Sequence, residues 1–238
     1  MANNKLSRVI ASNISYHDQV AEEYNAVMDA HRPNESIRQR VKEKFCSLVA
    51  PGSVLDFGGG TGLDLEWLTA AGYAVVFCEP SVGMRTHAMT LANSLSGKVH
   101  FLEGPATDFN TWEQIAPFRK VDAILSDFGP LNYIPDISSL FSNTSRIIKP
   151  GGHFILLVLH LPFAKRWKWH RRNALVNLLS GGTFRMYIPY KEHRQMVFVH
   201  TEKEIRDAAS PWFRYEGAEQ LRDHDFTLIH LTRHETTD

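Results

Sequence analysis

The chain has 238 residues, its 26 lysines and arginines balance its 26 aspartates and glutamates, and 43% of its residues are hydrophobic. This length fits one domain with a full core and room for an insertion. Because the chain is neutral, it has no overall electrostatic attraction to nucleic acid. Two cysteines are too few for a disulfide framework and have no spacing typical of a zinc site. The longest strongly apolar run is residues 154–159, which is too short to cross a bilayer. The N-terminus lacks the apolar core of a signal peptide, so we expect a cytoplasmic protein without a metal, a nucleic-acid partner or a stably inserted membrane segment.

The first half of the chain alternates between strand-like and helix-like segments. Residues 1–50 are expected to form a helical cap, with helices at 18–28 and 34–49. Within residues 51–160, short apolar runs predict strands at 53–57, 73–78, 98–103, 121–126 and 153–160, and helical patterns predict helices at 63–71, 81–94 and 137–148. This alternation is typical of a parallel sheet with helices on both faces.

The pattern changes after residue 160. Residues 161–200 are expected to be an insertion that covers a substrate, and residues 201–238 a helix and two strands that complete the core. The predicted elements are strands at 183–188 and 195–200, a helix from 201 to about 209, and strands at 212–221 and 225–232. Residues 165–172 are basic and aromatic, which indicates either a solvated helix face, a lid that attracts an anionic substrate, or a helix on a membrane surface.

The strongest motif lies where the first core strand meets the first core helix. Residues 54–62 read Val-Leu-Asp-Phe-Gly-Gly-Gly-Thr-Gly. Glycines at such a turn adopt positive φ cheaply and let a ligand approach the backbone. Glu79 ends the second strand, where a carboxylate accepts hydrogen bonds from a ribose diol. Together these features predict a ligand with an adenosine-like ribose.

The glycine spacing argues against a dinucleotide. The dinucleotide fingerprint Gly-x-Gly-x-x-Gly would require glycine at position 63, which is Leu63. No Gly-Lys-Ser/Thr follows either, so the loop is not a phosphate loop. An NAD-dependent oxidoreductase is therefore the disfavoured alternative.

Several motifs in register resemble those of a known family. Asp56-x-Gly58-x-Gly60-x-Gly62, followed by Glu79-Pro80-Ser81-x-x-Met84, is similar to the class I S-adenosylmethionine-dependent methyltransferases, in the branch that acts on small molecules. The similarity continues through residues 16–24, 121–128 and 148–152 in the family's order. It implies a Rossmann-like α/β fold with a seven-stranded, mostly parallel sheet whose last strand is antiparallel, helices on both faces, and an inserted lid after strand five.

The resemblance also implies an activity and a set of cofactor-binding residues. The implied reaction transfers a methyl group from S-adenosyl-L-methionine to a small-molecule acceptor, leaving S-adenosyl-L-homocysteine; an oxygen or nitrogen nucleophile on an anionic or aromatic acceptor is expected. The implied cofactor-binding residues are Tyr16, Tyr24, Asp56, Gly58, Gly59, Gly60, Glu79, Pro80, Met84, Ala106, Asp108, Ser126 and Phe128. Among them, Glu79 would bind the ribose hydroxyls, and Asp56 would hold the loop and the amino group.

One stretch departs from the family's pattern. The family often has Gly-Asp-Ala after strand three, where the aspartate accepts from the adenine amino group, whereas this chain has Pro105 at the aspartate position. Asp108 or a backbone carbonyl would then accept the hydrogen bond from the adenine amino group.

The acceptor side is predicted less directly. We expect a histidine to help deprotonate an oxygen or nitrogen nucleophile, with His160 as the leading candidate because it follows strand five at the ligand-bearing edge. His17 and His31 in the cap are weaker candidates. A non-catalytic module that binds the same cofactor is the alternative function, and the sequence leaves the oligomeric state open.

Overall fold

The fold was analysed in a computed structural model, which describes residues 2–30, 33–102, 117–180, 183–190, 192–221 and 224–235. In the N-terminal half the elements are α1 (Ala2–Ala30), α2 (Pro33–Leu48), β1 (Ser53–Phe57), α3 (Leu65–Ala70), β2 (Ala74–Cys78), α4 (Val82–Ala92), β3 (Val99–Leu102) and β4 (Val121–Ser126). They are followed by the 3-10 helix η1 (Pro130–Tyr133), α6 (Ile137–Ile147), β5 (Ile148–Leu159), α7 (Phe163–Trp169), α8 (Arg171–Ser180), β6 (Phe184–Tyr190), β7 (His193–Val199), α9 (Glu202–Ala209), β8 (Phe213–Leu221) and β9 (Phe226–Arg233).

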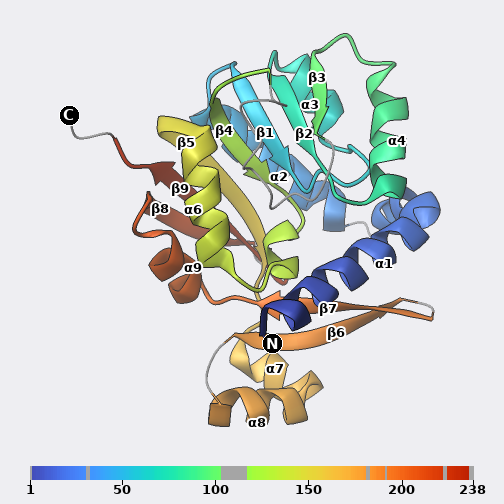
Figure 1. The fold of residues 1–238 in the computed structure, drawn as a ribbon, viewed down its shortest axis with the longest axis vertical. Helices are drawn as coiled ribbons and strands as arrows, with labels where there is room; N and C mark the ends of the chain where they lie inside the picture. The colour runs from blue at the N-terminus through green and yellow to red at the C-terminus, as the bar shows by residue number, and fades with distance from the viewer. Residues whose placement is uncertain are drawn as a thin grey trace.

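Over the described residues, seven strands form one sheet in the order β3-β2-β1-β4-β5-β9-β8 (Figure 1). β1 to β5 run parallel, whereas β9 is antiparallel to both β5 and β8. The predicted sheet with an antiparallel last strand is therefore confirmed. The chain leaves β1 for β2 on one side and returns to β4 on the other, and this reversal opens a crevice at the carboxyl ends of the strands.

Helices cover both faces of the sheet, as the alternation of buried residues in the strands requires. Leu55 and Phe57 of β1 belong to a core cluster with residues of α6 and α9. Val54 precedes Leu55 and therefore points to the opposite face, where it belongs to a cluster with residues of α2, α3 and α4. Since both faces are packed, the carboxyl edge of the sheet is the part of the core left for a ligand.

The N-terminal helix is longer than the sequence predicted. The helix expected at residues 18–28 begins at Ala2, and α1 lies across the N-terminus of α4. There Asp18 accepts hydrogen bonds from the Ser81 hydroxyl (2.7 Å) and the Gly83 amide (3.0 Å). Gly83 permits this approach, because a Cβ there would lie 3.0 Å from the Ala21 side chain.

The insertion between β5 and α9 contains α7, α8 and the β6–β7 hairpin, so the strands predicted at 183–188 and 195–200 are present. The buried Asn13 of α1 fixes the hairpin, because its side chain donates to Met196 O and accepts from Met196 N, both at 2.9 Å. Asn132 of η1 bridges the hairpin and β5 in the same way, donating to Phe198 O (2.9 Å) and accepting from Leu159 N (2.8 Å). The insertion is thereby held against both α1 and the sheet.

The described residues offer neither a membrane span nor a cluster of metal ligands. No described helix combines the length and the apolar character that a bilayer span requires. Among the residues that the structure places, no group of three or more histidine, cysteine, aspartate or glutamate side chains is arranged to hold a metal ion.

Candidate functional site

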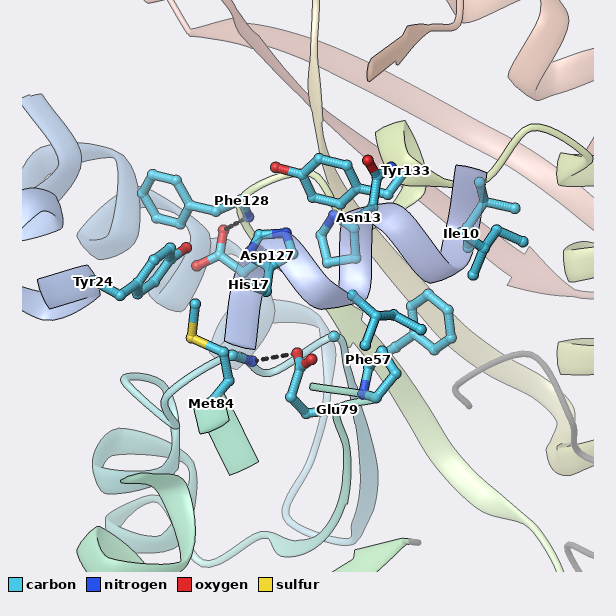
Figure 2. Close-up of a pocket in the computed structure, with 16 residues that line it drawn as sticks. Ile10, Asn13, His17, Tyr24, Phe57, Glu79, Met84, Asp127, Phe128 and Tyr133 are labelled. Carbon is cyan, nitrogen blue, oxygen red and sulfur yellow. Dashed lines mark hydrogen bonds between the residues drawn. The ribbon is translucent and has the colours of Figure 1, made fainter. Parts of the chain in front are cut away.

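A cavity lies at the carboxyl ends of β1, β2 and β4, between the glycine loop, α1 and η1 (Figure 2). It contains about 860 Å³ of empty space, and this volume includes the part that opens to solvent. The lining residues are Ile10, Asn13, Ile14, His17, Tyr24, Phe57, Gly58, Gly60, Glu79, Pro80, Met84, Asp127, Phe128, Pro130, Tyr133 and Ile134. Most of this wall is apolar, with a few polar groups set into it.

The glycine loop forms the floor of the cavity. Gly58 and Gly60 adopt positive φ of 73° and 57°. A Cβ at Gly58 would lie 2.5 Å from the Pro130 side chain, so close packing excludes any side chain there. A Cβ at Gly60 would meet only the Tyr24 ring, at 4.0 Å, so the missing side chain leaves open space beside the loop. The backbone at Gly60 is therefore accessible to a ligand.

Glu79 directly follows β2, lies beside the glycine loop and is buried. One carboxylate oxygen accepts from the Gly60 amide (3.0 Å) and the other from the Ser81 amide (2.8 Å). Burial raises the pKa of Glu79 to about 7, although these two hydrogen bonds oppose the shift. Each oxygen keeps a further lone pair for a donor on a ligand.

A smaller cavity beside the same loop is lined by further carboxylates. Asp56 and Asp127 are buried, and each has an oxygen, Oδ2, without a hydrogen-bond partner among the described residues. Burial, reinforced by the nearby Asp64, raises the pKa of both groups. The Arg38 guanidinium lies 3.3 Å from Asp64 Oδ1 and 3.9 Å from Asp127 Oδ2, and it stacks over the Phe128 ring at 4.7 Å. Buried acceptors without donors indicate that a ligand with a cationic donor fits here.

The wall opposite the loop is aromatic and neutral. The His17 ring lies edge-on to the rings of Tyr16, Tyr24 and Tyr133, at centroid distances of 5.3, 6.5 and 5.1 Å. Burial lowers the pKa of His17 to about 4, so its imidazole is neutral at physiological pH and can accept a hydrogen bond. Burial also raises the pKa of Tyr24 to about 12 and that of Tyr133 above its ordinary value, so both phenols stay protonated.

The structure places the predicted cofactor-binding residues as follows. Those that line the main cavity are Tyr24, Gly58, Gly60, Glu79, Pro80, Met84 and Phe128, and those that line the smaller one include Asp56 and Gly59. Tyr16 lies behind the wall, buried against Met84, and Ser126 is buried at the end of β4. Ala106 and Asp108 fall outside the described residues.

His160 does not line either cavity, contrary to the position expected for it. It follows β5, where its backbone amide donates to Asp225 O at 2.7 Å. The 3-10 helix η1 packs over this end of β5, tied to it by the Gly129 N to Leu157 O hydrogen bond (2.9 Å), so η1 supplies the cavity wall in place of His160. His17, the weaker candidate, does line the cavity, and His31 lies outside the described residues.

Sequence reasoning missed several lining residues. Asp127 stands directly between the predicted Ser126 and Phe128, so its position after β4 was the available signal. Ile10 and Ile14 precede the predicted start of the first helix, and only their four-residue spacing indicated one helical face. Nothing in the sequence indicated that Tyr133 lines the cavity, because the 3-10 helix that contains it was not predicted.

The chain is similar to several known proteins. A demethylmenaquinone methyltransferase from Paenarthrobacter aurescens (strain TC1) is 27% identical over 154 residues, which cover 63% of this chain and 56% of that protein. The chain thus matches about half the length of its curated relatives. A solved complex of DhpI with SAM and HEP has a TM-score of 0.70 at 19% identity, covering 94% of this chain and 97% of that one. The 1,6-didemethyltoxoflavin-N1-methyltransferase of Burkholderia thailandensis, solved with 1,6-didemethyltoxoflavin and S-adenosylhomocysteine, has a TM-score of 0.61 at 16% identity, covering 94% and 91%.

The family assignment depends on a match over most of the chain. Residues 28–210 match the family model described as "Methyltransferase domain". The solved structures share the fold of this chain across more than nine-tenths of its length. The protein therefore belongs to the methyltransferase-domain family.

Proposed function

We propose that this protein is an S-adenosylmethionine-dependent methyltransferase with a small, apolar acceptor. The observation that carries the proposal is the open backbone at Gly60 beside buried carboxylates with unsatisfied oxygens. S-adenosylmethionine has a sulfonium, an ammonium group and two ribose hydroxyls, so it offers positive charge and hydrogen-bond donors to the carboxylate oxygens that have no partner. A dinucleotide would instead bring two phosphates next to these carboxylates, which is unfavourable.

The residues fit the parts of this cofactor. Glu79 would accept from the ribose hydroxyls, and the free oxygens of Asp56 and Asp127 would accept from the ammonium group. Arg38, which already faces Asp127, would hold the carboxylate end. The chemistry that the bound cofactor supplies is an activated methyl group, which passes to an acceptor nucleophile and leaves S-adenosylhomocysteine.

The acceptor is proposed to bind between α1 and η1. Ile14, Pro130 and Ile134 give this part of the cavity an apolar surface, which favours the aromatic acceptor over the anionic one. His17 is unprotonated at physiological pH, whereas the phenols of Tyr24 and Tyr133 on the same wall keep their protons, so we place the hydrogen-bond acceptor for an O–H or N–H nucleophile at His17 and not at His160. The methyltransferases named above, for demethylmenaquinone and 1,6-didemethyltoxoflavin, support an unsaturated, ring-containing acceptor.

The open cavity beside the loop favours an enzyme over a binding module, because a module that only senses the cofactor needs no acceptor space.

The two cysteines, Cys46 and Cys78, are free, which supports the cytoplasmic location.

The test is transfer of a labelled methyl group from S-adenosylmethionine to a panel of phenols, hydroquinones and aromatic amines. We expect labelled product from at least one planar acceptor. Binding of the cofactor without transfer to any acceptor class would favour the binding module instead.

A further inference from the structure

Large apolar side chains are concentrated on one part of the surface. Eight of them, between 41% and 78% exposed, lie on α7, α8 and β6: Phe163, Trp167, Trp169, Leu175, Val176, Leu178, Leu179 and Tyr187. Elsewhere in the described ranges, the other large apolar side chains that are this exposed are Val82 and Met89 of α4. We call the exposed face of α7 and α8 the α7–α8 surface. Leu161, which precedes α7, and Ala174 of α8 are buried in a cluster with the hairpin, whereas the tryptophans of α7 and the leucines of α8 are exposed.

The same surface is strongly basic. The sequence has no aspartate or glutamate between Asp136 and Glu192, whereas residues 161–190 contain Lys165, Arg166, Lys168, Arg171, Arg172 and Arg185. Some of these cations lie over the exposed rings, with Lys165 Nζ 5.4 Å from the Trp169 ring centre and the Arg171 guanidinium 5.9 Å from that of Trp167. Lys165 also pairs with Asp225, in the turn that precedes β9. Lysines, arginines and tryptophans arranged around exposed leucines match the composition of protein surfaces that lie in a membrane interface.

We propose that the α7–α8 surface docks on an anionic lipid bilayer. A second copy of this chain is a poorer partner, because apposing two such surfaces would bring like charges together without an acidic group in the segment to neutralise them. A nucleic acid would match the charge but would leave exposed leucines such as Leu178 and Leu179 without an apolar partner. A bilayer with acidic headgroups satisfies both the charge and the apolar side chains.

The position of this surface in the fold agrees with docking. α7 and α8 form one end of the molecule, beyond the β6–β7 hairpin and away from the seven-stranded sheet (Figure 1). Tyr133, which lines the main cavity, packs against the core of the insertion. If a bilayer contacts α7 and α8, the core of the insertion separates it from the Tyr133 wall of the cavity. The docking proposal depends on the surface alone and holds whether or not the cavity transfers methyl groups.

The test is sedimentation of the full chain with vesicles of phosphatidylcholine, with and without about 30% phosphatidylglycerol, at an ionic strength of about 0.15 M. We expect binding to the anionic vesicles and little binding to the neutral ones. Neutralising two exposed cations with K168Q/R172Q should weaken binding about 25-fold, since each cation near an anionic surface contributes about fivefold. L178S/L179S should weaken it by about tenfold or more, since two exposed leucines lose their apolar contact.

Matched controls lie on α4 and before β3. K98Q removes an exposed cation, and M89S removes an exposed apolar side chain that is 48% accessible, and both should bind vesicles as the native chain does. Circular dichroism and melting temperature show that each variant is folded. Absence of binding to anionic vesicles, or equal losses in the controls, would overturn the proposal. So would a dimer in solution that L178S/L179S converts to monomer, because a second copy would then cover the surface.

Discussion

Replacing Glu79 with glutamine removes one negative charge from the proposed cofactor site with little change in the shape of the side chain. In the native protein, the Gly60 and Ser81 amides donate to the two carboxylate oxygens at 3.0 and 2.8 Å. A glutamine amide has one oxygen, so one of these donors would face an NH₂ group. Because Glu79 is buried, leaving that donor unsatisfied costs about 1–3 kcal/mol.

The effect on ligand binding follows from the lost charge. Hydrogen bonds to an ionised group contribute about 1.5–3 kcal/mol, so losing one from the ribose weakens cofactor binding by about 10- to 150-fold. Asp56, Asp127 and Arg38 remain in place, so binding should weaken but persist.

Glu79 also predicts a pH dependence with a definite sign. Its pKa rises from the ordinary 4.5 to about 7 in the folded protein, so the folded state binds this proton more tightly than the unfolded state. Its contribution to stability is therefore full below pH 4.5 and is lost as pH rises through 7, a difference of about 3 kcal/mol. Cofactor affinity should change in the opposite direction, rising from pH 6 to 8 as the carboxylate ionises, and both trends should flatten in E79Q.

The assays are isothermal titration calorimetry with S-adenosylhomocysteine and thermal unfolding, each at pH 6 and pH 8. The matched control is E66Q, because Glu66 is an exposed carboxylate on α3 outside both cavities. If E79Q binds the ligand within twofold of the native protein at pH 8, the carboxylate does not hold the ribose and the reasoning fails.

Three further variants, two of them with a matched control, test other parts of the structure. Gly60→Ala should weaken cofactor binding about tenfold or more in calorimetry and lower the free energy of unfolding by about 1–2 kcal/mol, because Gly60 has a positive φ. The control Gly72→Ala, at another positive φ with room for a Cβ, should lower the free energy of unfolding by about the same amount and leave cofactor binding unchanged. His17→Phe should lower the rate of methyl transfer by about 100-fold with cofactor affinity unchanged, whereas His160→Ala should change neither; the opposite pattern would restore the base to the end of β5. Asn13→Ala removes two hydrogen bonds to β7 and should lower the free energy of unfolding in urea by about 1–3 kcal/mol, and an unchanged value would show that α1 is held by other contacts.

Most of the sheet was predictable because its strands are short apolar runs bounded by turns. The parallel arrangement of β1 to β5 follows from that alternation, whereas the antiparallel β9 was implied by the family resemblance. The start of α1 was missed because its first half is polar, and Ile10 and Ile14 face a cavity that other elements create. A helical face of that kind becomes apparent only when its partner is known.

The part of the site that we propose for the cofactor was predictable where a residue lies at the end of a strand or in the turn that follows it. Asp56, Gly58, Gly60 and Glu79 all lie near the carboxyl ends of β1 and β2, so local pattern was enough. The part of the cavity that we propose for the acceptor was not predictable in this way. It is assembled from α1 and η1, which are far apart in the chain, and the packing of η1 over β5 decides that His160 stays outside.

The most direct test of the central claim is a comparison of ligands on the native protein. Calorimetric titration with S-adenosylmethionine, S-adenosylhomocysteine and NAD measures which nucleoside the loop and carboxylates accept. We predict that both sulfur ligands bind at one site per chain and that NAD binds much more weakly, because its phosphates would face Asp56, Asp127 and Glu79. Tighter binding of NAD than of either sulfur ligand, or no binding of the sulfur ligands, would contradict the account.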